Sequence, residues 1–277
     1  MKWRPFVRAD VPAAQRLSLE AGWPHRVEDW EYVLSLGSGW AVDDSLGLAA
    51  CLLIWRHGSR HASLGMVLVA GRLQRRGVGR MLGDLAVAEL AGRNVLLNST
   101  AQGERLYRQL GFRRYGSVAQ HQGPNARLAP VVPFRGERLR PLGQSDAARL
   151  RSLTARAAGY HRDEVMDSLL NVSEGVALDR GGSMLGFALV RRFGRGHVIG
   201  PVVAPDAQRA KVLIAHWIAH RPRSFLRVDV PARARLGPWL TSAGLLEVDR
   251  VASMALGEAP KPHGRARVFA LVNQALG

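Results

Sequence analysis

One loop in this sequence combines glycines and arginines in an order suited to binding phosphate. The loop is Gln74-Arg75-Arg76-Gly77-Val78-Gly79-Arg80, and it follows the apolar run Val67-Leu68-Val69. Apolar residues then recur at helical spacing up to about Ala91, which predicts a helix that begins near Gly77. The first N–H groups of a helix lack helical partners and lie at the positive end of its dipole, so they bind anions readily. Glycine lets a phosphate approach the backbone closely, and the arginines add positive charge.

Two other phosphate-binding motifs share features with this loop but do not fit it. A dinucleotide-binding fingerprint needs a third glycine where Leu82 stands, and its loop follows the first strand of the fold. A P-loop needs a lysine after its last glycine, and none of Lys2, Lys211 and Lys261 follows a glycine. A phosphate cradle of another kind and an ordinary turn before a helix remain as interpretations.

The elements around the loop form a pattern that repeats in the second half of the chain. Helices are predicted over residues 11–21, 27–36, 77–91 and 102–110, and again over 145–157, 162–170, 206–220 and 233–243, with short strands between them. Each copy has an α+β order and lacks strict βα alternation. We expect an N-terminal domain over 1–122, a proline-rich linker over 123–134, a C-terminal domain over 135–257 and a tail over 258–277 with a short helix at 265–276.

Composition and charge narrow the class of protein. The 277 residues are 47% hydrophobic and 22% charged, as in a globular protein, and the apolar stretches fall far short of the ~20 residues of a membrane helix. The first residues lack the apolar segment of a secretory signal, so we expect a cytoplasmic protein with no membrane partner. The net charge of +17 comes mostly from arginine and is spread along the chain without a basic tail, which argues against a nucleic-acid partner.

The remaining chemically reactive side chains do not form a metal site. Cys51 is the only cysteine and lies in an apolar run, which indicates a small buried hydrophobe. His216 and His220 would share one face of a helix, but Trp217 stands where a zinc protease has glutamate, and no third ligand is evident. We therefore expect no metal.

The loop and the segment after it resemble the GCN5-related N-acetyltransferases. In that family a Gln/Arg-x-x-Gly-x-Gly loop between the fourth strand and the third helix cradles the pyrophosphate of coenzyme A, and Gln74–Gly79 fits this pattern in the same place. Leu106-Tyr107 and Gly111-Phe112 are similar to the family's closing Leu-Tyr-x-x-x-Gly-Phe motif. The whole chain resembles the tandem two-domain members. The resemblance implies two domains, each a mixed, mostly antiparallel sheet flanked by helices, with acetyl-CoA as co-substrate.

The same resemblance implies roles for residues of the first copy. The residues implied to contact the cofactor are Val67, Leu68, Val69, Gln74, Arg75, Arg76, Gly77, Val78, Gly79, Arg80 and Asn98. The loop would bind the pyrophosphate, and the backbone of the strand before it would pair with the pantetheine arm and donate to the oxyanion. Tyr107 would protonate the departing thiolate as general acid while the amine attacks acetyl-CoA directly. The alternative for Tyr107 is a helix residue that anchors its ring in the core.

The acceptor amine is expected to meet the segment between the first two helices. The candidate residues there are Trp23, His25, Asp29 and Trp30. His25 would take the proton, Asp29 or Glu28 would hold an ammonium group, and the indoles would form walls. The two acids equally suit the first turn of a helix, and His61, Asn98 or a water chain are other routes for the proton. We expect a primary amine of a small molecule, with a protein or peptide amine as the alternative, and a monomer or homodimer.

The second copy lacks the features of the first. Where the first has its glycine loop, the second has Ala204-Pro205-Asp206-Ala207-Gln208, with no glycine and an added acid, and Leu240 stands in place of Tyr107. We predict that the second domain does not bind acetyl-CoA in this way, and that it packs against the first and shapes the acceptor pocket. A function of another class, a non-catalytic sensor or scaffold that binds acetyl-CoA, would keep the loop without using Tyr107.

Overall fold

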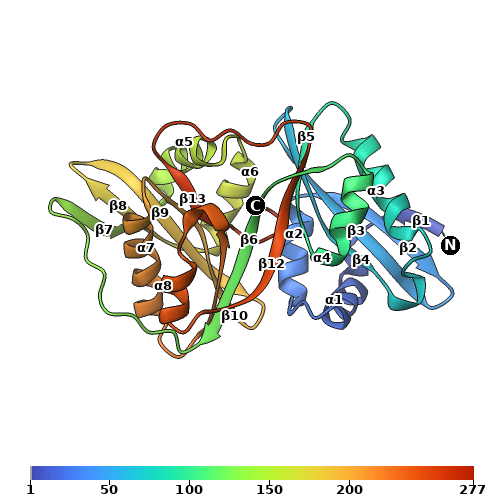
Figure 1. The fold of residues 1–277 in the computed structure, drawn as a ribbon, viewed down its shortest axis with the longest axis horizontal. Helices are drawn as coiled ribbons and strands as arrows, with labels where there is room; N and C mark the ends of the chain where they lie inside the picture. The colour runs from blue at the N-terminus through green and yellow to red at the C-terminus, as the bar shows by residue number, and fades with distance from the viewer. Residues whose placement is uncertain (1) are drawn as a thin grey trace. The chain divides into compact units, whose positions relative to one another are not determined.

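The computed structural model describes residues 2–277, which form two compact units. Unit 1 runs to Tyr115 and includes Ala252–Ala259, whereas unit 2 comprises Gly116–Val251 and Pro260–Ala275. In each unit a mixed, mostly antiparallel sheet is flanked by helices (Figure 1). The predicted fold class is confirmed.

The sheet of unit 1 combines antiparallel strand pairs with a parallel pair. Its elements are β1 (Lys2–Pro5), α1 (Val11–Glu20), α2 (Val27–Ser35), β2 (Ser38–Asp44), β3 (Gly47–His57), β4 (His61–Val69), α3 (Val78–Glu89), β5 (Asn94–Ser99) and α4 (Ala101–Gln109), with the end of β12 (Leu246–Leu256). Strands β1 to β4 pair antiparallel with one another in chain order, β4 and β5 are parallel, and β12 pairs antiparallel with β5. The four predicted helices of this half lie within two residues of those observed.

The two faces of the unit 1 sheet pack against different helices because side chains alternate along each strand. Leu52 and Ile54 of β3 lie in one apolar cluster with Leu82 of α3. Trp55 lies on the other face, where its indole Nε1 donates a 2.8 Å hydrogen bond to the Val33 carbonyl of α2. The helix after the predicted phosphate loop and the helix after the predicted acceptor segment therefore belong to opposite faces of one sheet.

Unit 2 repeats this order. Its elements are the main part of β6 (Arg113–Pro124), β7 (Glu137–Pro141), α5 (Ala147–Ala158), α6 (Asp163–Val172), β8 (Glu174–Arg180), β9 (Ser183–Phe193), β10 (Gly196–Ala204), α7 (Ala207–His220), β11 (Phe225–Pro231), α8 (Gly237–Ser242) and β13 (Arg267–Ala270). Helix α8 begins later than the predicted residue 233, with Pro238 in its first turn, and a separate 3-10 turn spans Ala232–Ala234. Proline is tolerated at the start of a helix and disrupts it further in.

An arginine that binds two aspartates occurs at the same place in both units. The contacts are Arg4 with Asp10 and Asp43 in unit 1, at 2.7 Å each, and Arg140 with Asp146 and Asp179 in unit 2, at 2.7 and 2.6 Å. In each unit the arginine lies on the strand before the first helix, β1 or β7. One aspartate lies just before that helix, and the other lies on the next strand, β2 or β8. This shared arrangement supports the duplication independently of the sheet order.

Each unit takes a strand from the other half of the sequence. Ala252–Leu256 of β12 pairs with β5 of unit 1, and Val118–Pro124 of β6 pairs with β11 of unit 2. The expected domain limits at residues 122 and 135 follow the sequence repeat, whereas the units divide after Tyr115 and Val251. A sequence repeat shows which strand follows which helix and does not show which sheet that strand enters.

Two connecting segments differ from their predicted structure. Residues 123 and 124 still belong to β6, so regular structure ends only after them. The tail is not helical over 265–276, because β13 pairs antiparallel with β10. An open strand edge presents N–H and C=O groups that a nearby segment satisfies by pairing, whereas a short isolated helix is marginal in water.

Candidate functional site

The predicted phosphate loop lies at the N-terminus of α3. Gly77 directly precedes the helix and has a φ of +82°. Residues with a side chain rarely adopt this left-handed backbone conformation. Arg75 also has a positive φ, 61°, so the backbone turns sharply on both sides of Arg76. A Cβ at Gly79 would meet Leu106 at 3.5 Å, an ordinary van der Waals contact. The shape of the loop therefore requires glycine at position 77, while the protein's own packing does not require it at position 79.

The charge around this helix end is positive. The first turn of α3 contains no acidic residue. Arg80 is ion-paired with an aspartate one turn later, and Arg72 is paired with Asp44, whose pKa this guanidinium lowers to about 2. Arg75 and Arg76 are exposed and form no ion pair with any residue that the structure describes. These two guanidinium groups are available to an anionic ligand.

Strand β4 reaches the loop with an irregular edge. On the β3 side the pairing shifts at Met66 and Val67, which form a bulge in which Met66 has φ +52°. On the other side β4 pairs with β5 only over His61–Ser63. From residue 64 to residue 69 this edge has no strand partner within the described part of the chain. An extended ligand could add here as a strand does.

Gln74 joins the end of this strand to the loop. Its side-chain Nε2 donates a 3.2 Å hydrogen bond to the Val69 carbonyl. The side chains of Val67 and Val69 pack against the apolar cluster that contains α3. Gln74 thus fixes the start of the loop to the end of β4, and the two valines contribute packing through their side chains.

Tyr107 on α4 is buried, with 7% of its surface exposed. Its ring packs edge-on against Phe112 with centroids 5.7 Å apart. Burial raises the pKa of the phenol above its ordinary value. Its hydroxyl makes no hydrogen bond to another residue of the described range 2–277. The side chain is therefore a rigid donor that stays protonated at neutral pH, and it is also part of the core.

Asn98 is held by a residue that the sequence did not suggest. It lies on β5 directly across from Ser253 on β12, and Ser253 Oγ donates a 2.8 Å hydrogen bond to Asn98 Oδ1. Their neighbours Leu97 and Met254 belong to the cluster on the α3 face. Asn98 and Ser253 therefore lie on the opposite face of the sheet. Only the observed pairing of β12 with β5 brings them together.

The segment between α1 and α2 places His25 among indole rings. Its ring centroid is 5.9 Å from that of Trp23 and 6.4 Å from that of Trp30. Trp30 is fully buried, and its Nε1 donates to a serine hydroxyl of α1. Asp29 is also buried and accepts hydrogen bonds from the backbone N–H and the guanidinium of Arg26. The side chains of Asp29 and Trp30 thus stabilise the start of α2. Those of Trp23 and His25 are half-buried and partly exposed to solvent.

The corresponding helix end in unit 2 carries its own carboxylate. Asp206 caps α7 by accepting a 2.9 Å hydrogen bond from the Arg209 backbone N–H, and it is ion-paired with the same arginine's guanidinium. Leu240, at the position that corresponds to Tyr107, is fully buried in the apolar core. The carboxylate satisfies a helix N–H that a phosphate would otherwise meet, and it would repel an anion.

The strand edge that is open in unit 1 is paired in unit 2. Strands β10 and β11 pair only at His197 and Val198, as β4 and β5 do near their beginnings. Beyond that point β13 runs antiparallel to β10, and the Leu271 N–H donates a 2.9 Å hydrogen bond to the Asp229 carbonyl of β11. A Cβ at Gly200 would lie 1.8 Å from the Leu271 carbonyl oxygen, so the tail contacts the backbone directly. The chain's own C-terminal strand occupies this place.

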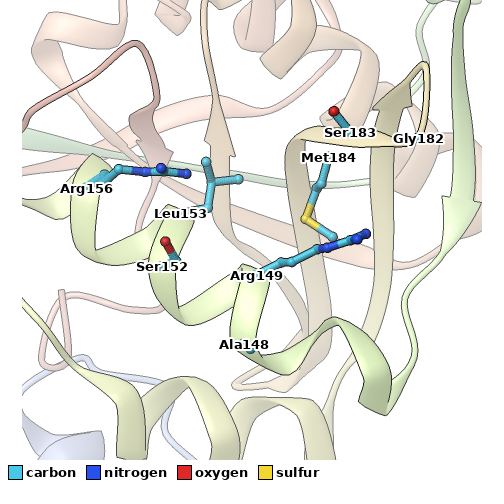
Figure 2. Close-up of a pocket in the computed structure, with 8 residues that line it drawn as sticks. All are labelled: Ala148, Arg149, Ser152, Leu153, Arg156, Gly182, Ser183 and Met184. Atoms are coloured by element: carbon cyan, nitrogen blue, oxygen red, sulfur yellow. The ribbon is translucent and has the colours of Figure 1, made fainter.

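Two surface cavities in unit 2 contain none of the loop residues. One, of about 390 Å³, lies between α5 and the β8–β9 turn, where Arg149 extends beside Met184 and Arg156 extends toward Leu153 (Figure 2). Both arginines are exposed side chains. The other, of about 520 Å³, is lined by residues of β6, β11, α8 and β12 and includes the buried His121.

Other reactive side chains are accounted for by local packing. Cys51 is fully buried, which raises the pKa of its thiol to about 12. The rings of His216 and His220 lie 4.0 Å apart, and His220 Nδ1 donates to the His216 carbonyl. Within residues 2–277, no group of three or more His, Cys, Asp or Glu residues could hold a metal ion. A search of the same residues for a helix long and apolar enough to cross a membrane found none.

Known protein families match both halves of the chain. Two models of the acetyltransferase (GNAT) domain match, one over residues 40–126 and the other over residues 150–270. The uncharacterized N-acetyltransferase YitH of Bacillus subtilis is 24% identical over 273 residues, which cover 96% of this chain and 95% of YitH.

Solved structures agree with the fold over nearly the whole length. A Pyrococcus horikoshii protein assigned to the acetyltransferases has a TM-score of 0.81 at 17% identity, with 100% of this chain and 95% of that chain covered. A tandem GNAT protein from the clavulanic acid biosynthesis pathway has a TM-score of 0.66 at 15% identity, with 95% and 99% covered. At these identities the likeness concerns the fold.

Proposed function

Because the chain is an acetyltransferase of the GCN5-related (GNAT) superfamily with two of its domains in tandem, we propose that unit 1 transfers an acetyl group from acetyl-CoA to a primary amine of a small molecule. The amine attacks directly in a ternary complex. The observation that carries this proposal is that an edge of β4, with which no described strand pairs beyond Ser63, leads into a positively charged helix N-terminus. Acetyl-CoA supplies the activated thioester and a diphosphate by which it is held.

The N-terminus of α3 suits the diphosphate. Its first N–H groups and the helix dipole attract an anion, with a contribution of about 0.3–1 kcal/mol for each such interaction. Arg75 and Arg76 add two cations that no described carboxylate neutralises. Gly77 gives the loop its left-handed turn, and Gly79 places no side chain in the first turn of α3 at its own position. Unit 2 has Asp206 at the equivalent place, which supports binding in unit 1 alone.

The edge of β4 suits the pantetheine arm and the thioester. Among residues 2–277, the backbone groups from residue 64 to residue 69 have no strand partner on the β5 side, and they can pair with an amide-containing chain. The bulge at Met66 and Val67 interrupts the regular ladder with β3, and a backbone N–H there would donate to the oxyanion. Removal of one such donor from an enzyme typically costs about 10²–10³ in kcat.

Tyr107 is proposed as the group that protonates the departing thiolate. The phenol is protonated at neutral pH, because its ordinary pKa is already far above 7 and burial raises that pKa further, and packing against Phe112 fixes its ring. A general acid in this role contributes about 10²–10⁴ to the rate. Asn98 is proposed to lie beside the thioester on the face where Ser253 orients its amide.

His25 is proposed to accept the proton of the incoming amine. The His25 side chain is half-buried and lies beside the indole of Trp23. Unlike Asp29, it does not form the start of α2. Asp29 is not retained as an ammonium-binding group, because its carboxylate is buried and bonded to Arg26. Trp30 is not retained as a wall, because its indole is fully buried.

A panel of amines tests the proposal. The full chain is incubated with acetyl-CoA and either small primary amines or short peptides with free amino groups, and released CoA thiol and acetylated product are both measured. We expect at least one small amine to be acetylated with an equal amount of CoA released. If only the peptides are acetylated, the acceptor is a peptide amine and the proposed small-molecule acceptor is wrong. Tight binding of acetyl-CoA without any acetylated product would support a non-catalytic sensor or scaffold.

A further inference from the structure

Unit 2 contains a cavity with a buried histidine that plays no part in the proposed acetyl transfer. The volume of about 520 Å³ lies within the range of small-molecule sites. His121 of β6 lines this cavity and is 1% exposed. Its Nδ1 lies 3.0 Å from the Leu245 carbonyl oxygen. A carbonyl only accepts, so Nδ1 carries a proton, and in the neutral ring Nε2 is left as an acceptor.

This Nε2 atom lacks the partner that a buried nitrogen needs. It is buried and has no hydrogen-bond partner among the described residues. The Glu247 carboxylate approaches it to 3.9 Å, which is too far for a hydrogen bond. A Cβ at Gly237 would lie 3.5 Å from Nε2, so the glycine keeps this side of the ring uncovered. A buried polar atom without a partner is costly, and a ligand donor would remove that cost.

Two arginines line the same cavity and differ in their partners. Arg250 donates two hydrogen bonds to the Glu247 carboxylate, at 2.9 and 2.8 Å. Arg235 forms no ion pair with any residue in the described part of the chain. Its backbone has φ +53°, a conformation that costs free energy for a residue with a side chain. The cavity thus contains the Arg235 guanidinium and the His121 Nε2 acceptor, neither of which has a hydrogen-bond partner among the described residues.

We propose that this cavity binds a small zwitterion of the amino-acid class. Its ammonium group would bond both His121 Nε2 and the Glu247 carboxylate, since an ammonium has enough N–H groups for two acceptors 3.9 Å apart. Its carboxylate would pair with Arg235. The lining residues all belong to unit 2, so the site is separate from the acetyl-CoA loop of unit 1.

Calorimetric titration of the full chain with each proteinogenic L-amino acid tests the proposal. The variants are Arg235→Gly and Glu247→Gln, and the control is Arg233→Ala. Arg235→Gly removes the guanidinium while glycine adopts the left-handed backbone without strain. Arg233 belongs to the 3-10 turn that ends just before Arg235, but it does not line the cavity. Glycine betaine, which has a carboxylate but no N–H group, is the matched probe.

We expect at least one amino acid to bind the wild-type chain and the Arg233→Ala variant equally, and to bind both cavity variants about tenfold or more weakly. Betaine should not bind. The proposal is overturned if no amino acid binds, if either cavity variant binds as tightly as the wild type, or if betaine binds as tightly as the amino acid.

Discussion

Ser253 on β12 orients the side-chain amide of Asn98 on β5 by donating a 2.8 Å hydrogen bond to its Oδ1. The serine comes 155 positions later in the chain than the asparagine that it holds. Both residues lie on the sheet face opposite α3. A residue from the C-terminal half of the sequence therefore shapes the proposed active site in unit 1.

Replacement of Ser253 by alanine tests whether this orientation matters. The Asn98 amide loses its fixed acceptor contact, which is worth about 0.5–1.5 kcal/mol. If Asn98 lies beside the thioester, we expect kcat to fall by roughly 3–10-fold while the Kd for acetyl-CoA changes little. Ser35→Ala is the control, because Ser35 Oγ bonds only to an exposed turn of α2. An unchanged kcat in Ser253→Ala would place Asn98 away from the reacting atoms.

Tyr107→Phe separates the two interpretations of Tyr107. The ring and its contact with Phe112 stay, and only the hydroxyl is lost. As a general acid, Tyr107 should be needed for turnover, so we expect kcat to fall by about 10²-fold or more with acetyl-CoA affinity kept. Because burial raises the pKa of this phenol, any loss of wild-type activity at moderately alkaline pH should come from another group. Full turnover in Tyr107→Phe would leave the tyrosine a purely structural role.

The glycines of the loop are expected to respond differently to alanine. In Gly79→Ala the added Cβ meets Leu106 and Val69 at ordinary contact distances, so the fold should be kept while a phosphate is pushed away. We expect an acetyl-CoA Kd about tenfold or more above that of the wild type, with little change in Tm. Gly77→Ala also forces alanine into a left-handed backbone, which costs about 1–2 kcal/mol, so both Tm and affinity should fall.

Gly71→Ala serves as the control for both substitutions. Gly71 lies shortly before the loop, its φ is not positive, and a Cβ there would meet nothing within 4 Å in the described chain. Its affinity and Tm should match those of the wild type. Equal affinities in Gly79→Ala and Gly71→Ala would argue against a diphosphate at this helix end.

The parts of the site that sequence predicted are those that local forces determine. The helix after Gly77 and the loop before it follow from helical periodicity and glycine conformations within one short segment. The tail was predicted as a helix and forms β13, because an unpaired edge elsewhere in the fold decides its structure. Ser253 was not identified for the same reason, since a serine in an apolar strand carries no sign of which strand it will join. The role of Asp29 was one of two alternatives, and only its contacts with Arg26 distinguish them.

Stability should fall in acid because of the arginine–aspartate contacts in both units. Hydrogen bonds from Arg140 lower the pKa of Asp146 below its ordinary 3.8, against the effect of burial. Burial alone would raise the pKa of Asp10, but hydrogen bonds from Arg4 and a backbone N–H outweigh it and lower the pKa. A carboxyl with a lowered folded-state pKa contributes stability that is present above its unfolded pKa and lost as pH falls through its folded pKa. We expect Tm to decrease steadily from about pH 5 to about pH 2.

Arg140→Met provides the matched variant for this pH dependence. It leaves two buried carboxylates, Asp146 and Asp179, without their cation. We expect a loss of roughly 1–3 kcal/mol at neutral pH and a shallower decline in acid. Arg138→Met, at an exposed position on the same strand, should behave as the wild type. Identical acid profiles for Arg140→Met and the wild type would mean that these contacts do not govern acid stability.

Each chain should bind one acetyl-CoA molecule, because both the C-terminal strand and Asp206 oppose a second one in unit 2. In unit 2, β13 pairs with the stretch of β10 that corresponds to the open edge of β4, and Asp206 caps the helix end. We expect calorimetry to give a stoichiometry of one for the full chain.

Truncation after Gly264 should expose the apolar surface that Phe269 and Val268 cover and lower Tm markedly, since each such side chain contributes about 1.5–3 kcal/mol when buried. The stoichiometry should still be one, because Asp206 continues to oppose a phosphate. Arg265→Ala, at an exposed position in the tail, is the control for Tm. Two bound molecules per full-length chain would contradict the assignment of the cofactor to unit 1 alone, and two per truncated chain would show that β13 by itself excludes the second.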